Sequence, residues 1–220
     1  KETLKKLLLF LVSFATGGLL GGAFLHLLPE AIEHLEEGLV LPLAILLGIL
    51  TFFILEKFIF WRHCHIPTSK EHPHPLVFMN LIGDGFHNLL DGVIIAASFM
   101  ANFSLGIATT LAVVFHEIPQ EIGDFGVLVY GGFNKIKALF FNFISGLTAV
   151  LGAFLTLILG AKFTNLVPFL IPFTAGGFIY IASSDLIPEL KKETQIGKSL
   201  IQFLGLLLGI GLMFLLILSE

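Results

Sequence analysis

Histidine, carboxylate and amide side chains gather in two short polar stretches of a chain that is otherwise mostly apolar. The first reads His87-Asn88-Leu89-Leu90-Asp91-Gly92, and the second reads His-Glu-Ile-Pro-Gln-Glu-Ile-Gly-Asp over residues 116–124. An ionisable group costs roughly 2.5–3.5 kcal/mol at the centre of a bilayer. We therefore expect a bound partner to offset this cost, and nitrogen and oxygen donors together favour a divalent metal ion.

The spacing of the donors predicts how they face one another. Side chains four residues apart lie on one face of a helix, which pairs His87 with Asp91 and His116 with Gln120. Two imidazoles, a carboxylate and an amide oxygen suit zinc or a neighbouring divalent transition metal. A histidine alone within a span is usually a packing residue, but two such pairs on consecutive apolar segments favour a metal site.

A second, adjacent metal site is predicted one position further along each helix. Asn88 and Glu117 lie about 100° around their helices from the first pair of ligands, and Asp91 or Gln120 would bridge the two sites. Glu121 is about 100° from Gln120, so we expect it to support the ligands rather than to bind.

Three other polar or helix-breaking residues surround the predicted ligands. Asp84 and Asp124 fit a structural role and a binding role equally well. Pro119 has no N–H and clashes with the carbonyl group of Phe115, so a bend and a freed backbone oxygen are expected there. Such a bend favours an irregular, hydrated cavity beside the ligands.

An intramembrane metallohydrolase is the alternative hypothesis for the second stretch. The protease pattern His-Glu-x-x-His places two metal ligands four residues apart and uses the glutamate as general base, a role that Glu117 would take. Here the second histidine position holds Gln120, and Pro119 stands in the middle of the pattern. Both departures disfavour an enzyme, and no catalytic cofactor is expected.

The composition is that of an integral membrane protein. The 220 residues are 56% hydrophobic and 13% charged, whereas soluble domains are about 45–50% apolar and about 25% charged. Nothing resembles a cleavable signal peptide, and the single cysteine excludes an internal disulfide. About 20 mainly apolar residues make a spanning helix. Seven stretches qualify and predict one all-α transmembrane domain over residues 1–220, with spans at 7–28, 39–61, 76–101, 104–130, 136–161, 165–188 and 199–218.

The basic residues predict the orientation of these spans. With seven alternating crossings, eleven of the twelve Lys and Arg residues fall on one side and only Lys162 falls on the other. The positive-inside rule makes the basic side cytoplasmic and places the C-terminus outside. The outer face then carries an acidic mouth suited to cations, formed by Glu30, Glu33, His34, Glu36 and Glu37.

Further polar residues mark a path to and from the predicted site. His26 and Glu30 end the first span at the outer face, and Asp185 and Glu189 end the sixth at the cytoplasmic face. The cytoplasmic linker at about 62–75 is rich in histidine and fits either a flexible loop that offers ligands or a solvated loop without that role. Its candidate ligands are His63, His65, His72 and His74.

Taken together, the two polar stretches resemble the signature of the ZIP (Zrt-, Irt-like protein) family of divalent metal transporters. The resemblance is to the subgroup with His-Asn-x-x-Asp-Gly in the fourth family helix and His-Glu-x-Pro-His-Glu-x-Gly-Asp in the fifth. The stretches His26-Leu27-Leu28-Pro29-Glu30-Ala31 and Asp185-Leu186-Ile187-Pro188-Glu189 also resemble the second and seventh family helices. The similarity covers nearly the whole chain, although the first of the eight family helices has no counterpart among the seven stretches.

The resemblance implies a transporter that moves a divalent metal into the cytosol, usually as a homodimer. On this mapping His87, Asp91, His116 and Gln120 form the primary site, with Asn88 and Glu117 in the second. We expect Zn²⁺ as the main substrate and Fe²⁺ or Mn²⁺ as others, because Gln120 stands where the subgroup usually has a second histidine, and an amide is a weaker ligand than imidazole.

Further expectations concern the second site, the partners and the location of the chain. Many bacterial relatives carry an acidic residue in the sixth family helix that completes the second site. Residues 145–150 offer none, so the second site is expected to be depleted. The expected partners are the metal ion, the lipid bilayer and a second copy of the chain, without nucleic acid. The expected location is the cell membrane rather than an internal one.

Overall fold

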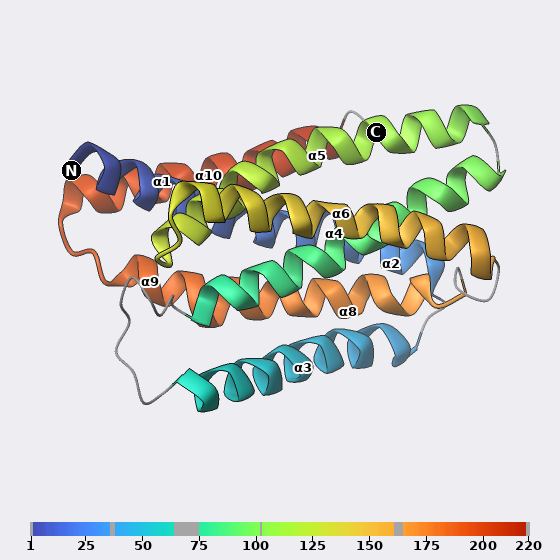
Figure 1. Ribbon diagram of the computed structural model, residues 1–220, viewed down its shortest axis with the longest axis horizontal. Helices are drawn as coiled ribbons and strands as arrows, with labels where there is room; N and C mark the ends of the chain where they lie inside the picture. The colour runs from blue at the N-terminus through green and yellow to red at the C-terminus, as the bar shows by residue number, and fades with distance from the viewer. Residues whose placement is uncertain (1, 36–37, 64–74, 102, 161–164, 219–220) are drawn as a thin grey trace.

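The protein is a bundle of long helices that lie side by side (Figure 1). The computed structural model describes residues 2–35, 38–63, 75–101, 103–160 and 165–218, and in these ranges it contains helices and no strand. The helical elements are α1 (Glu2–Gly21), η1 (Gly22–Leu27), α2 (Leu28–His34), α3 (Val40–His63), α4 (Pro75–Ala101), α5 (Phe103–Tyr130), α6 (Lys135–Leu159), α8 (Val167–Tyr180), η2 (Ile181–Leu186), α9 (Ile187–Lys191) and α10 (Ile196–Ile217).

These elements form long helical runs at each of the predicted apolar stretches, which confirms the all-α, multi-pass fold. Five runs are long and apolar enough to cross a membrane by length and composition alone. They are Lys6–Glu33, Val40–Phe58, Lys135–Leu159, Val167–Lys191 and Ile196–Ile217. The helices α4 and α5 are not among these five, because their polar side chains lower the mean hydropathy. With 27 and 28 residues, each is still about 40 Å long at 1.5 Å per residue.

Two of the helical runs contain a wider, π-helical turn next to a proline. Pro29 follows η1 and Pro188 follows η2, each within the first turn of the next α-helix. A proline inside a helix has no N–H and clashes with the carbonyl group four residues earlier. A π-turn moves that carbonyl group away, and such turns are frequent at functional sites. The two Pro-Glu pairs therefore share a local backbone geometry as well as a sequence.

Close backbone contacts between paired glycines join six of the long helices two by two. In the pair α3 and α8, a Cβ atom added to Gly48 would lie 2.1 Å from the carbonyl oxygen of Phe173, and one added to Gly176 would lie 2.2 Å from that of Ile45. Small residues let membrane helices approach in this way. The reciprocal pairs are Gly17 with Gly209 (α1 and α10), Gly48 with Gly176 (α3 and α8) and Gly92 with Gly152 (α4 and α6).

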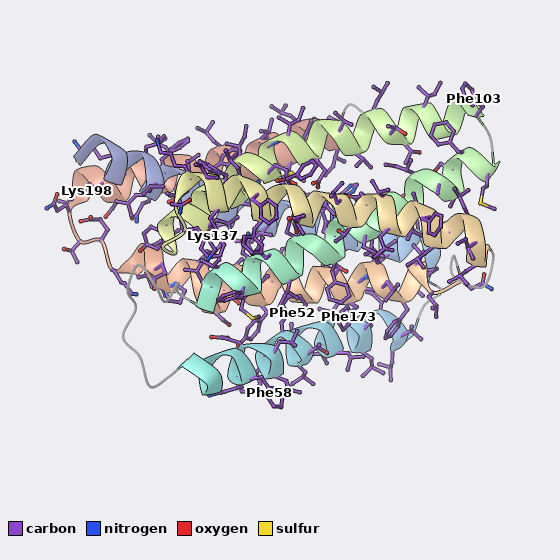
Figure 2. All side chains as sticks on the ribbon, viewed as in Figure 1. Phe52, Phe58, Phe103, Lys137, Phe173 and Lys198 are labelled. Atoms are coloured by element: carbon purple, nitrogen blue, oxygen red, sulfur yellow. The ribbon has the colours of Figure 1, made fainter. Side chains whose placement is uncertain are left out.

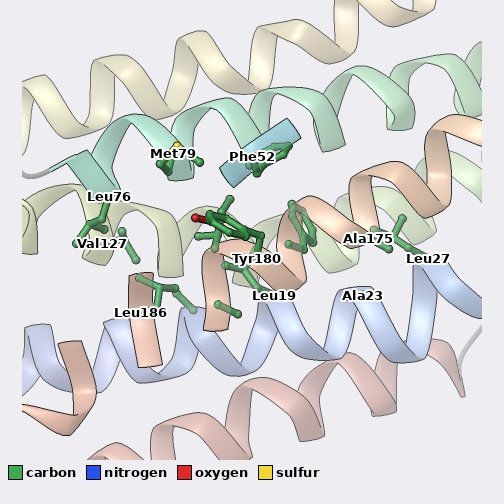
Figure 3. Close-up of a cluster of buried hydrophobic side chains, with 14 of the residues drawn as sticks. Leu19, Ala23, Leu27, Phe52, Leu76, Met79, Val127, Ala175, Tyr180 and Leu186 are labelled. Carbon is green, nitrogen blue, oxygen red and sulfur yellow. The ribbon is translucent and has the colours of Figure 1, made fainter. Parts of the chain in front are cut away.

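A buried apolar cluster fills the space between the helix pairs (Figure 3). It draws on α1, α3, α4, α5 and α8 as well as on both π-turns, with Phe52, Phe178 and Met79 among its largest members. Outside the bundle, large apolar side chains such as Phe58 (61% exposed) and Phe103 (71%) point away from the core (Figure 2). An apolar exterior of this kind is what contact with lipid requires.

Two of the described basic side chains lie toward one end of the bundle. Lys137 and Lys198 are found toward the end that also holds the N-terminus and α9, whereas Phe103 lies at the opposite end (Figure 2). Lys137 packs over the ring of Phe133, with Nζ 4.3 Å from the ring centroid. These two lysines thus lie at the same end of the bundle, as the order of the spans predicts.

Candidate metal centre

Three of the predicted ligands meet where α4 packs against α5. His87 Nε2 lies 3.6 Å from Asp91 Oδ2 on the same helix and 3.3 Å from Glu117 Oε1 on α5. One ligand atom from each of the three residues lies within 4.8 Å of the others. His87 and Asp91 are buried, and 14% of the Glu117 side chain is exposed. An imidazole and two carboxylates at this separation can hold one divalent cation.

A second group of three carboxylates lies beside the first and shares Glu117 with it. Asp84 from α4 and Glu121 from α5 complete this group, again with ligand atoms within 4.8 Å of one another. The surface of α6 that faces Glu121 is made of small or neutral residues. The Asn142 amide donates to the carbonyl oxygen of Glu121 (2.9 Å), and an added Cβ at Gly146 would lie 3.3 Å from Glu121 Oε1.

The second group differs from the one expected from the sequence. Its shared residue is Glu117 rather than Asp91 or Gln120, and its carboxylates come from α4 and α5 without an acidic residue of α6. The expectation that Glu121 only supports the ligands rests on its rotation of about 100° from Gln120. Glu121 is instead four residues beyond Glu117, so these two carboxylates share a helix face. That spacing is the signal in the sequence for this pair of carboxylates.

Asn88, predicted as a ligand of the second site, is held within its own helix. Its amide Nδ2 donates to Oδ1 of Asp84 at 2.9 Å and to the Asp84 carbonyl oxygen at 3.2 Å. Asn88 is buried, with 4% of its surface exposed. In this arrangement its amide orients the Asp84 carboxylate, which belongs to the second group.

Gln120 faces a cavity enclosed mainly by α1, α4, α5 and α10. It is 9% exposed, and neither of its side-chain polar atoms has a hydrogen-bond partner in the part of the chain that the structure describes. The helix α5 continues without interruption through Pro119, which lines the same cavity. The lining residues are Phe14, Ala15, Gly18, Leu19, Asn80, Asp84, Pro119, Gln120, Asp124, Phe178, Gly209, Leu212 and Met213.

Several predicted ligands lie outside the described residues. They are the side chains of His116 and His63, and the loop residues His65, His72 and His74. The acidic mouth is described only in part, since the side chain of His34 and residues 36–37 also lie outside the described set. Their roles remain predictions from the sequence.

The predicted path residues lie in the two π-turns and in the short helices that follow them. His26 belongs to η1 and Glu30 to the first turn of α2. Asp185 belongs to η2 and Glu189 to α9, and both are buried. These two acids are thus placed in one region, as their spacing of four residues predicts.

Sequence reasoning missed the acid that α3 contributes to this region. The carboxylate of Glu56 accepts a hydrogen bond from the Tyr180 hydroxyl and also interacts with Asp185. The Tyr130 hydroxyl at the end of α5 donates to Glu189 Oε2 at 2.8 Å. A single carboxylate in the apolar run 39–61 was the signal that could have identified Glu56.

The fold and the buried groups define an integral membrane protein with nitrogen and oxygen donors arranged for a divalent cation. Comparison with known proteins agrees with this class. The family described as "ZIP Zinc transporter" matches this chain over residues 1–76 and 68–217. The chain belongs to the ZIP zinc transporter family.

Several relatives of the chain carry the name zinc transporter. "Zinc transporter ZIP13" of Pongo abelii is 37% identical over 221 residues, which cover 93% of this chain and 65% of that protein. "Zinc transporter zipt-7.1" of Caenorhabditis briggsae is 30% identical, over 96% of this chain and 71% of the relative. "Zinc transporter SLC39A7" of Mus musculus is 31% identical, over 96% and 63%. The chain thus spans about two thirds of the length of these relatives.

Proposed function

We propose that the chain carries a divalent transition metal ion through the membrane into the cytosol. Zn²⁺ is the preferred substrate, and Fe²⁺ and Mn²⁺ are further ones. The single observation that carries this proposal is the group of His87, Asp91 and Glu117, which lies buried between α4 and α5. The names of the relatives, all of them zinc transporters, support the choice of ion.

The chemistry of the group supports a metal as the ligand. Buried carboxylates require a compensating charge, and a divalent cation supplies it to Asp91 and Glu117 at once. His87 adds a nitrogen ligand of the kind that zinc and its neighbours accept. The ring of His87 packs against Phe178, with centroids 5.1 Å apart, which holds the imidazole in place. In this proposal His116 and Gln120 complete the ligand set from α5.

The family resemblance implies transport into the cytosol, and the distribution of charge indicates which side of the membrane that is. The side with eleven of the twelve basic residues is cytoplasmic by the positive-inside rule. Metal would enter from the side of His26 and Glu30 and leave past Asp185 and Glu189 toward the histidines of the cytoplasmic loop. Rocking of groups of helices about the site would open it to each side in turn.

We propose transport rather than hydrolysis. Glu117 lies with the metal ligands His87 and Asp91, a position that suits coordination better than activation of a water molecule. Zn²⁺ is therefore a substrate and no catalytic cofactor takes part. We further propose that the chain works as a homodimer in the cell membrane, as the family resemblance implies.

Uptake by proteoliposomes tests this function. The purified chain is reconstituted, and accumulation of radioactive zinc, iron and manganese is measured with and without a pH gradient. Wild-type vesicles should accumulate zinc above protein-free vesicles, and Asp91→Ala vesicles should not. Thr156→Ala is the matched control, because Thr156 is a buried polar residue of α6 that bonds to the carbonyl group of Gly152 in its own helix. Equal uptake by wild type and Asp91→Ala would overturn the site.

A further inference from the structure

We propose that the cavity between α1, α4, α5 and α10 is a further cation station beside the two candidate metal groups, and that it holds a hard divalent cation such as Mn²⁺ on oxygen ligands. This proposal rests on the proposed function, because the station would extend the route of the same substrate. Its ligands would be the carboxylates of Asp84 and Asp124 with the amide oxygens of Asn80 and Gln120. Asp84 would be shared with the carboxylate group of Glu117 and Glu121, and Gln120 with the ligand set proposed around His87. All four residues line this cavity.

Polar residues on two helices continue into the cavity at helical spacing. Asn80 and Asp84 are four residues apart on α4, and Gln120 and Asp124 are four apart on α5, so each pair shares one helix face. The Asn80 amide Nδ2 donates to Asp124 Oδ1 at 2.9 Å and joins the two helices. The station thus begins about one turn of α4 from His87.

Buried polar atoms remain unsatisfied around this cavity. Asn80 Oδ1, Asp84 Oδ2 and both polar atoms of the Gln120 side chain have no hydrogen-bond partner within the described ranges. Asn80, Asp84 and Gln120 are 2%, 5% and 9% exposed. A buried polar group without a partner is destabilising, and native proteins rarely leave such groups in that state. A ligand bound in the cavity would provide partners for all of these atoms.

The negative charge of the residues that line the cavity favours a cation as that ligand. Two carboxylates line the cavity, and no Lys or Arg stands among the lining residues that the structure describes. The opposite wall is apolar and includes Phe14, Leu212 and Met213. Water alone would satisfy the amide atoms but would leave the carboxylates without a counter-charge. A ligand set made only of oxygen favours hard cations, unlike the group with His87.

Two substitutions test the station without changing His87, Asp91 or Glu117. Asp124→Asn removes one charge and keeps an oxygen that can accept from Asn80. Gly18→Leu fills the cavity from α1, where an added Cβ meets no atom within 4 Å. Met213→Leu is the control, since it preserves the volume of an apolar lining residue. Binding of Mn²⁺ to the purified full chain in detergent is titrated by electron paramagnetic resonance, and zinc binding by calorimetry.

We expect Asp124→Asn and Gly18→Leu to bind one Mn²⁺ fewer per chain, or to bind it about tenfold or more weakly, while Met213→Leu resembles wild type. If the Gly18→Leu protein still binds zinc, its fold is intact. If Asp124→Asn misfolds, Mn²⁺ binding by Gly18→Leu alone tests the station. Mn²⁺ binding equal to that of wild type in the folded variants would show that the cavity holds only water, and would overturn the station.

The zinc-uptake assay is independent of this result. Failure of wild-type vesicles to accumulate zinc would remove the proposed function, whereas loss of Mn²⁺ binding in the two variants would still establish the cavity as a cation site. Conversely, zinc uptake by wild type together with unchanged Mn²⁺ binding in the variants would remove the station alone.

Discussion

His87 Nε2 and Glu117 Oε1 lie 3.3 Å apart across the contact between α4 and α5. The two residues are 30 positions apart along the chain, and their contact joins the two polar stretches. Because Glu117 also belongs to the carboxylate group with Asp84 and Glu121, it connects the two candidate metal groups. The predictions below follow from this arrangement and from the packing that holds it in place.

Removal of the imidazole should abolish tight zinc binding. His87→Ala takes away the nitrogen ligand and leaves Asp91 and Glu117 as buried like charges. Substitution of groups that only support metal ligands typically costs 10–100-fold in affinity, so loss of this ligand should cost more than about 100-fold. Calorimetry on the purified chain measures the change. A zinc affinity within a few-fold of wild type would contradict the assignment of His87.

A second imidazole at position 120 should sharpen the preference for zinc. Gln120→His replaces a weak amide ligand by a nitrogen ligand, which zinc accepts better than Mn²⁺ does. In competition uptake experiments, the ratio of zinc to manganese should rise about tenfold or more. Gln202→His is the matched control, because Gln202 is a buried glutamine of α10 that does not line the cavity. An unchanged ratio in Gln120→His would argue against a ligand role for this position.

A methyl group at a paired glycine should destabilise the bundle. In Gly48→Ala the new Cβ would lie 2.1 Å from the carbonyl oxygen of Phe173, so α3 and α8 must move apart. Overpacking of this kind costs about 1–3 kcal/mol. The midpoint of thermal denaturation in detergent should fall for Gly48→Ala and should stay or rise for Gly211→Ala, where an added Cβ meets no atom within 4 Å. Equal midpoints would contradict the close contact.

The hydroxyl of Tyr130 should restrain the short helix α9. It donates to Glu189 Oε2 at 2.8 Å, and a hydrogen bond to a charged group contributes about 1.5–3 kcal/mol. Glu189 also pairs with Lys192, but the exposed lysine should add little. In Tyr130→Phe, hydrogen exchange of the α9 amides should become about tenfold faster or more. Thr110→Val, which alters the other end of α5, should leave α9 unchanged; equal acceleration in both variants would refute a specific role for Tyr130.

The fold was largely predictable because apolar runs of membrane length leave few alternatives. Spans at 136–161 and 199–218 were expected, and the structure has α6 at Lys135–Leu159 and α10 at Ile196–Ile217. The π-turns were not predicted, although Pro29 and Pro188 marked their places. A hydropathy pattern averages over many residues, whereas a π-turn depends on where one carbonyl group must avoid one proline ring.

The candidate site was predictable only where its ligands follow helix periodicity. His87 and Asp91 are four residues apart, and the structure brings them together with Glu117. The approach of Asp84 to Glu117, and of Glu56 to Asp185, depends on how separate helices pack. Spacing within one helix carries no information about rotation and depth relative to another helix, so these contacts could not be read from the sequence.

The paired glycines also bear on how the bundle can deform. Where two backbones touch, as at Gly92 and Gly152, the helices have no layer of side chains between them that could be compressed or sheared. Each such pair of helices should therefore move as one rigid unit. Most of the relative motion in the molecule should occur at the interfaces between these units, where side chains fill the space. His87 and Asp91 lie on one rigid unit, formed by α4 and α6. Glu117 lies on α5, for which no such glycine pair is found among the described residues. A small displacement of α5 along its interface with α4 would change the distance between His87 and Glu117 directly and leave the distance between His87 and Asp91 nearly fixed.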